Sequence, residues 1–240
     1  MWHISLLKDL SVKEGTGSLF DLSFSSNGKY LATCTGWPEN IARVSLSHNA
    51  FFYNDHILPL FPLTQVWDVG KRHARNVFKG HFGGILALDF SPDGRFLISG
   101  SFDGTVRIWN MRDGSSRIFN HSNHDVFSVR FSPDGRRLAA GNEGGEVFIW
   151  ELRSGHLVAL LDGMHTDYVD NVDFMPNGEG LIIGSWDKTL KYRDITGLSS
   201  AWMPDEKGHD EEADGAEKKG NFTFVGHTVC PFRLQFLFQI

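Results

Sequence analysis

Short apolar runs separated by tight-turn signals recur along most of the chain. Four segments share a phenylalanine that is followed three residues later by Asn-Gly or Asp-Gly, and they span 24–28, 90–94, 131–135 and 174–178. An apolar run starting with leucine follows each segment, and later runs alternate with a period of two, as half-buried strands do. Asn-Gly and Asp-Gly favour hairpin turns because both residues tolerate a positive φ. The pattern predicts an all-β chain of short antiparallel strands.

The strand pattern repeats with a nearly constant spacing. Trp67, Trp109 and Trp150 are 42 and 41 residues apart, and the last three turn phenylalanines are 41 and 43 residues apart. This period is typical of WD repeats, which form four strands per blade over about 40–45 residues. The chain therefore resembles a WD-repeat β-propeller, and residues 1–228 are assigned to it, with repeats from about residue 17. The expected fold is a partial propeller of about four four-stranded antiparallel blades, plus a stub that begins at Gly226-His227.

The resemblance implies a hydrogen-bonded tetrad of His, Ser or Thr, Asp and Trp within each blade. The second unit matches it fully, with His81, Ser99, Asp103 and Trp109. The other units depart from it. The first has Thr33 and Trp67 but no matching His, and the third has Ala140 at the Ser position and Gly144 at the Asp position. The fourth keeps His165 and Asp187 but has Arg193 at the Trp position. His, Ser and Asp together also suggest a catalytic site. Because fragments of the set recur, whereas an active site needs one copy, we interpret the tetrad as structural.

Two segments interrupt the pattern. The spacing from the strand-starting leucine to the Trp position is 12 residues in three units but 36 in the first, so about 24 extra residues lie within 35–63. This insertion is apolar, unlike ordinary loops, and residues 229–240 form an equally unpatterned apolar tail. One interpretation is a partner-binding insertion. We favour the other, in which both segments are non-coding sequence retained by an incorrect gene prediction, and we expect deletion of 35–63 to improve folding.

The segment 199–220 is polar and acidic. It contains seven carboxylates against three lysines and few apolar residues, so the sequence predicts a flexible loop between blades. His209 lies in this segment, and we do not expect it to bind a metal because no second ligand follows at a suitable spacing.

Composition and charge narrow the classes of function. A net charge of −6 argues against a general nucleic-acid-binding surface. The chain has no apolar run of 18 residues, and its first residues lack the pattern of a secretory signal, so we expect neither a membrane span nor export. Two cysteines, Cys34 and Cys230, provide no disulfide framework, which favours a reducing compartment.

Several strands resemble a particular family of WD-repeat proteins. Residues 23–34 rejoined to 64–67, together with 147–158 and 184–191, are similar to blades of the fungal Tup-type, Groucho-like, transcriptional co-repressors. That family also has a long polar loop before a Gly-His blade opening, where 199–225 lies here. The resemblance implies a nuclear scaffold that binds DNA-bound regulators as proteins, without a cofactor, a metal, a small-molecule substrate, or direct contact with nucleic acid or membrane.

Two other functions compete with this interpretation. One is a generic WD-repeat scaffold of another complex, in a ubiquitin ligase or in RNA processing, with a cytoplasmic location as the alternative to the nucleus. The other is an enzyme, and against it stands the lack of a nucleotide-binding glycine loop, a metal cluster or a nucleophile elbow in the sequence.

The resemblance also locates a binding rim, at the start of each first strand and at the turn before each Asp position. Counting back from the strand-ending phenylalanines gives Leu86, Phe127 and Asp170 at four residues, and Gly84, Asp125 and Tyr168 at six. With the turn residues added, the predicted partner-binding set is Phe102, Asp125, Phe127, Glu143, Tyr168, Asp170 and Trp186. Its aromatics suit interaction hot spots, and its carboxylates select basic partners. In the alternative, Phe102, Phe127 and Trp186 fill gaps between blades.

The same repeats predict the core and its limits. We expect Phe90, Phe131, Phe174, Ile108 and Ile149 to be buried between blades. The family's ring has seven blades and this chain supplies four, so we expect unpaired sheet edges at the open ends and low solubility.

Overall fold

The computed structural model describes residues 19–35, 52–53, 56–57, 62–71, 73–119, 123–198 and 222–225. Every regular element within these ranges is a β-strand, which confirms the all-β prediction. The acidic segment 199–220 and the tail 229–240, which includes Cys230, lie outside the described residues.

Sixteen of the strands form four antiparallel sheets of four strands each. Sheet 1 contains β1 (Leu19–Phe24), β2 (Tyr30–Thr35), β5 (Leu63–Asp68) and β6 (His73–Lys79). Sheet 2 contains β7 (Ile85–Phe90), β8 (Phe96–Ser101), β9 (Val106–Asn110) and β10 (Ser116–Phe119). Sheet 3 contains β11 (Val126–Phe131), β12 (Arg137–Asn142), β13 (Val147–Glu151) and β14 (Leu157–Leu161). Sheet 4 contains β15 (Val169–Phe174), β16 (Gly180–Ser185), β17 (Thr189–Asp194) and β18 (Phe222–Val225).

The Asp-Gly turns form as the sequence predicts. Gly94, between β7 and β8, has a φ of 67° and donates its N–H to Ser91 at 2.8 Å. Asp93 accepts hydrogen bonds from the Ser91 hydroxyl at 2.6 Å and from the Arg95 N–H at 3.0 Å. An aspartate followed by glycine therefore satisfies the turn locally, which is why this signal can be read without tertiary information.

The second and third strands of each sheet have the same register. Leu31 pairs with Trp67 in sheet 1, just as Leu97 pairs with Trp109 in sheet 2. The insertion therefore lies between two correctly paired strands and leaves their register unchanged. β2 ends at Thr35 and β5 begins at Leu63, so the insertion lies within the connection 36–62 between them. Two short strands within it, β3 (Phe52–Tyr53) and β4 (His56–Ile57), pair only with each other.

Replacing residues 36–63 by the four-residue turn 102–105 of sheet 2, which restores the spacing between the paired strands, is expected to raise thermal stability. β2 and β5 are already paired in hairpin register. Shortening their connection lowers the entropic cost of closing the loop by about 1–2 kcal/mol. Thermal unfolding and soluble yield measure the effect. Loss of soluble protein on this replacement would show that the insertion is an integral part of the fold.

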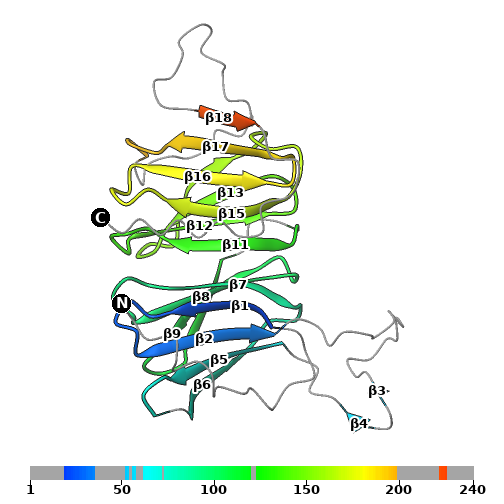
Figure 1. The fold of residues 1–240 in the computed structure, drawn as a ribbon, viewed down its shortest axis with the longest axis vertical. Helices are drawn as coiled ribbons and strands as arrows, with labels where there is room; N and C mark the ends of the chain where they lie inside the picture. Colours follow the sequence, from blue (N-terminus) through cyan, green and yellow to red (C-terminus); the bar gives the residue numbers. More distant parts are fainter. Residues whose placement is uncertain are drawn as a thin grey trace, which may run out of the picture.

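Neighbouring sheets pack face to face in chain order (Figure 1). The first strands contact one another in sequence, β1 with β7, β7 with β11 and β11 with β15. Three apolar clusters fill the three spaces between sheets. The residues predicted for these spaces are all buried, which confirms the core prediction, and they are Phe90, Phe131, Phe174, Ile108 and Ile149.

The outer side of sheet 1 has no such neighbour among the described residues. Phe24 occupies the repeat position of Phe90, Phe131 and Phe174, yet 43% of it is exposed, whereas each of those is at most 7% exposed. The sequence predicts unpaired sheet edges at the open ends. The structure corrects this expectation, because the sheets stack through their faces and the missing neighbour leaves a face uncovered.

Candidate functional site

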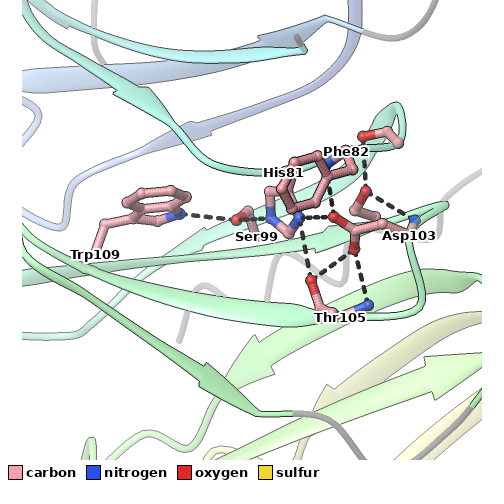
Figure 2. A network of polar contacts seen from close by, with 8 residues as sticks. His81, Phe82, Ser99, Asp103, Thr105 and Trp109 are labelled. Atoms are coloured by element: carbon pink, nitrogen blue, oxygen red, sulfur yellow. Dashed lines mark hydrogen bonds and ion pairs between the residues drawn. The ribbon is translucent and has the colours of Figure 1, made fainter. Parts of the chain in front are cut away.

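The tetrad residues of sheet 2 form one continuous chain of hydrogen bonds (Figure 2). The Trp109 indole N–H donates to Ser99 Oγ at 2.8 Å, and Ser99 Oγ lies 2.7 Å from His81 Nε2. His81 Nδ1 lies 2.8 Å from Asp103 Oδ2, which also accepts the N–H of Phe82 at 2.9 Å. The other carboxylate oxygen accepts the hydroxyl and the N–H of Thr105. The chain joins the loop before β7 to β8, to the following turn and to β9.

The direction of each bond follows from the protonation of its groups. A carboxylate only accepts, so His81 Nδ1–H donates to Asp103, and because burial favours the neutral imidazole, His81 Nε2 accepts the Ser99 hydroxyl. Burial lowers the pKa of His81, although its bond to Asp103 opposes the shift. Burial opposes ionisation of Asp103, but the bonds from His81, Thr105 and Phe82 hold the pKa of this carboxyl well below its usual range. The pair is thus a neutral imidazole beside a carboxylate.

This arrangement has the connectivity of a Ser-His-Asp triad but not its accessibility. A nucleophile has to reach its substrate, and both Ser99 and His81 are 0% exposed. The Ser99 oxygen also accepts the Trp109 N–H, so it is already engaged inside the core. The geometry therefore favours the structural interpretation of these four residues.

Stability is expected to fall with acidification through His81. Because its pKa is lower in the folded state than in the unfolded chain, the stabilisation is present above pH 6.5 and is lost as the pH falls through the folded value. Urea unfolding at pH 7.5, 6.5 and 5.5 measures the slope, which is up to about 1.4 kcal/mol per pH unit for each proton. His81→Gln removes the titrating group, and its slope should be shallower. An unchanged slope would show that His81 keeps its ordinary protonation in the fold.

The partial tetrads form only the bonds that their residues permit. In sheet 1 the Trp67 indole donates to Thr33 at 3.2 Å. In sheet 4 His165 Nδ1 lies 2.8 Å from Asp187, but Ile183 replaces the serine and leaves His165 Nε2 without a hydrogen-bond partner. Partial tetrads in several sheets are expected if the tetrad joins the strands of a sheet and its residues are lost one by one as the repeats diverge.

The predicted rim residues are paired through their backbones in three sheets. The N–H of Phe102 donates to Gly84 at 2.9 Å. The N–H of Glu143 donates to Asp125 at 2.9 Å, and that of Trp186 donates to Tyr168 at 3.0 Å. The turn residues and the residues six positions before the strand-ending phenylalanines are therefore neighbours, at one end of each of these three sheets.

A β-bulge at the start of each first strand turns one side chain toward a shared cavity. The register shifts occur between Leu19 and Asp21, Ile85 and Ala87, Val126 and Ser128, and Val169 and Asn171. The skipped residues are Phe20, Leu86, Phe127 and Asp170, and all four line one cavity of about 300 Å³. A bulge redirects a side chain and often occurs beside functional sites. Phe20 was not among the predicted rim residues, although the same count of four residues back from Phe24 identifies it.

Four aromatic rings form a continuous row along the rim. Phe102 meets Phe127 edge-on with ring centroids 6.0 Å apart, and Phe127 stacks on Tyr168 at 5.3 Å. Tyr168 lies 6.1 Å from Trp186, which is 46% exposed. The row joins sheets 2, 3 and 4, with Phe102, Phe127 and Tyr168 in contact between sheets, whereas Trp186 contacts Tyr168 of its own sheet. Its outer end, however, presents an open indole to solvent.

The charged residues of the rim differ in their surroundings. Burial raises the pKa of Asp170, although a hydrogen bond from the Trp186 side chain opposes the shift. Glu143 lies 4.0 Å from His124, and both side chains are partly exposed. Arg130 lines the cavity as well, so the site combines cationic and anionic groups with apolar walls.

Three further features concern metal binding, membrane crossing and thiol chemistry in the part of the chain that the structure describes. It has no group of three or more His, Cys, Asp or Glu side chains placed to hold a metal ion. It also contains no helix with the length and hydropathy needed to cross a membrane. Cys34 is a free thiol in the core, and burial raises its pKa.

Comparison with known proteins identifies the repeats. Residues 73–110, 115–151 and 156–194 match WD40, described as the WD domain with the G-beta repeat. Each matched segment begins with the last strand of one sheet and continues through the first three strands of the next, as in β6 followed by β7, β8 and β9. One repeat therefore belongs to two sheets and ties them together covalently.

Three relatives match parts of the chain. Protein SOF1 of Saccharomyces cerevisiae is 30% identical over 93 residues, which cover 38% of this chain and 16% of that protein. Protein groucho of Drosophila melanogaster is 37% identical over 64 residues, which cover 27% and 9%. The WD repeat and HMG-box DNA-binding protein 1 of Mus musculus is 45% identical over 51 residues, which cover 21% and 5%. The matches span less than a fifth of each relative, and the three matched segments show that the chain contains WD40 repeats.

Proposed function

We propose that the chain is a non-enzymatic scaffold whose rim binds short segments of DNA-bound transcription regulators. WD40 repeats generally mediate contacts between proteins. The observation that carries the proposal is the row of four aromatic rings beside a cavity lined from all four sheets. Aromatic side chains that are held rigid and partly exposed are typical of interaction hot spots.

The rim is organised before any partner arrives. Backbone hydrogen bonds fix Phe102, Glu143 and Trp186 in their turns, and the stacked rings restrict one another. Binding then loses little side-chain entropy, which raises affinity for a short segment. Asp125, Glu143 and Asp170 add negative charge to the rim, which favours partners with basic residues.

Resemblance supports the choice of transcription regulators as partners. Residues 23–34, 147–158 and 184–191 resemble Tup-type, Groucho-like co-repressors, and a part of the chain matches protein groucho. We place the protein in the nucleus on the same grounds. With a net charge of −6, contact with DNA is expected to be indirect, through the bound regulators.

A peptide array tests the proposal with the full chain as the probe. The array carries 15-residue peptides that tile transcription regulators, ubiquitin-ligase subunits and RNA-processing proteins from the same genome. We expect binding to be concentrated in the transcription regulators and in peptides that contain basic residues. Binding concentrated in either of the other two sets would favour a scaffold of that kind of complex instead.

Variants at the rim tie the array signal to the site. For the peptide that binds most tightly, the double variant Trp186→Ala, Asp170→Asn should raise the dissociation constant at least tenfold, because the exposed ring and the neighbouring charge are both removed. Ile118→Ala is the matched control, because Ile118 is 49% exposed on β10 and takes no part in the row. Equal losses for the two proteins would place the binding site elsewhere.

A further inference from the structure

The outer face of sheet 1 exposes residues that the other sheets bury. Leu22 lies two residues before the strand-ending Phe24, in the position of Leu88, Val129 and Val172 in the other sheets. Those three residues are 0% exposed, whereas Leu22 is 46% exposed. The repeat position is the same in all four sheets, so the difference comes from the lack of a preceding sheet among the described residues and not from the local sequence.

The exposed residues of this face form one apolar surface. Leu22 and Phe24 point the same way because they alternate along β1, and they are 46% and 43% exposed. Large apolar side chains gathered on one face of a protein mark a surface that another protein covers.

The interfaces inside the molecule indicate what fits on such a face. Leu88 and Phe90 of sheet 2 share a cluster with Ala32 and Val66, a cross-strand pair of sheet 1. In the next interface Phe131 shares a cluster with Ile98 and Ile108, the corresponding pair of sheet 2. Each apolar face is thus covered by one cross-strand pair of the preceding sheet.

Sheet 4 presents the corresponding pair on its outer side. Ile182 is paired with Tyr192 in the register that Ile98 has with Ile108. Ile98 is fully buried, whereas Ile182 and Tyr192 are only half-buried. The two ends of the arc therefore carry the two halves of an interface that is already formed three times within the chain.

We propose that a second copy of this chain completes the ring, with sheet 1 of each copy packed against sheet 4 of the other. The two ends are complementary to each other and not to themselves, so the contact joins unlike faces. Two such contacts related by a two-fold axis close an assembly of eight sheets and leave no free face. Eight blades lie within the range of about four to eight that propellers adopt.

The mass of the full chain in solution tests this assembly. Sedimentation equilibrium should show a concentration-dependent change from 27.0 kDa to twice that value. Leu22→Lys should raise the dissociation constant of the dimer at least a hundredfold, because each of its two interfaces then buries a lysine. Ile118→Lys is the control, because it places the same charge on an equally exposed residue outside the face, and it should leave the dimer unchanged.

Mixing two variants separates this geometry from any other dimer. Ile182→Lys should dissociate the dimer just as Leu22→Lys does. In an equal mixture of the two, one of the two interfaces contains no lysine, so a mixed dimer should re-form. A wild-type monomer at all concentrations, open chains that lengthen with concentration, or a mixture that stays monomeric would each overturn the proposal. Circular dichroism verifies that both variants keep the strand content of the wild type.

Discussion

Replacing Phe131 with alanine is expected to lower the free energy of unfolding by about 3–5 kcal/mol, the usual range for a buried phenylalanine. Phe131 is 6% exposed and packs with Ile98 and Ile108 of the preceding sheet, so its removal leaves a cavity between sheets 2 and 3. Urea unfolding monitored by tryptophan fluorescence measures the change. A loss below about 1 kcal/mol would mean that the sheets are not packed as described.

Phe24→Ala provides the matched control, because Phe24 has the same repeat position but 43% of it is exposed. We expect it to lower stability by less than about 1 kcal/mol, in the range of surface substitutions. Both changes are made in the Leu22→Lys background, so that no second copy covers the face. Equal losses at the two positions would contradict the description of sheet 1 as uncovered.

The second large effect is expected at Asp103. Asp103→Ala removes the acceptor of the buried His81 N–H together with the acceptors of the Phe82 and Thr105 N–H groups. Leaving a buried donor unsatisfied is unfavourable by about 1–3 kcal/mol, so the total loss should be about 2–4 kcal/mol. The same urea measurement gives this value.

Asp113→Ala is the control for Asp103, because Asp113 also holds a turn but bonds to the exposed Ser115. Its effect should be well below that of Asp103→Ala. If the two variants lose the same stability, the tetrad contributes no more than an ordinary surface turn.

The repeats and the strands were predictable because their signals are local. An Asp-Gly turn satisfies its own hydrogen bonds, as Asp93 does, and the spacing from leucine to tryptophan sets the register that Leu97 and Trp109 adopt. The tetrad of sheet 2 was predictable from the family resemblance, and its residues lie within hydrogen-bonding distance as that resemblance implies.

Other features depend on which sheets meet and could not be read from one repeat. Phe24 and Phe131 have the same local sequence pattern, and only the presence of a preceding sheet decides that one is buried. The cavity that Phe20 and Asp170 line forms only where the first strands of all four sheets come together, so it could not be predicted from the sequence of any one strand.

The central claim, that the aromatic rim is where partner proteins bind, is tested most directly by photocrosslinking in cells. A benzophenone amino acid is placed at Trp186, which is exposed at the end of the aromatic row, or at Ile118, which is equally exposed on β10. We expect crosslinks to transcription regulators from position 186 and not from position 118, and we expect these crosslinks to be lost when Asp170→Asn is added. Equal crosslinking from both positions, or crosslinks to the same partners from position 118 alone, would contradict it.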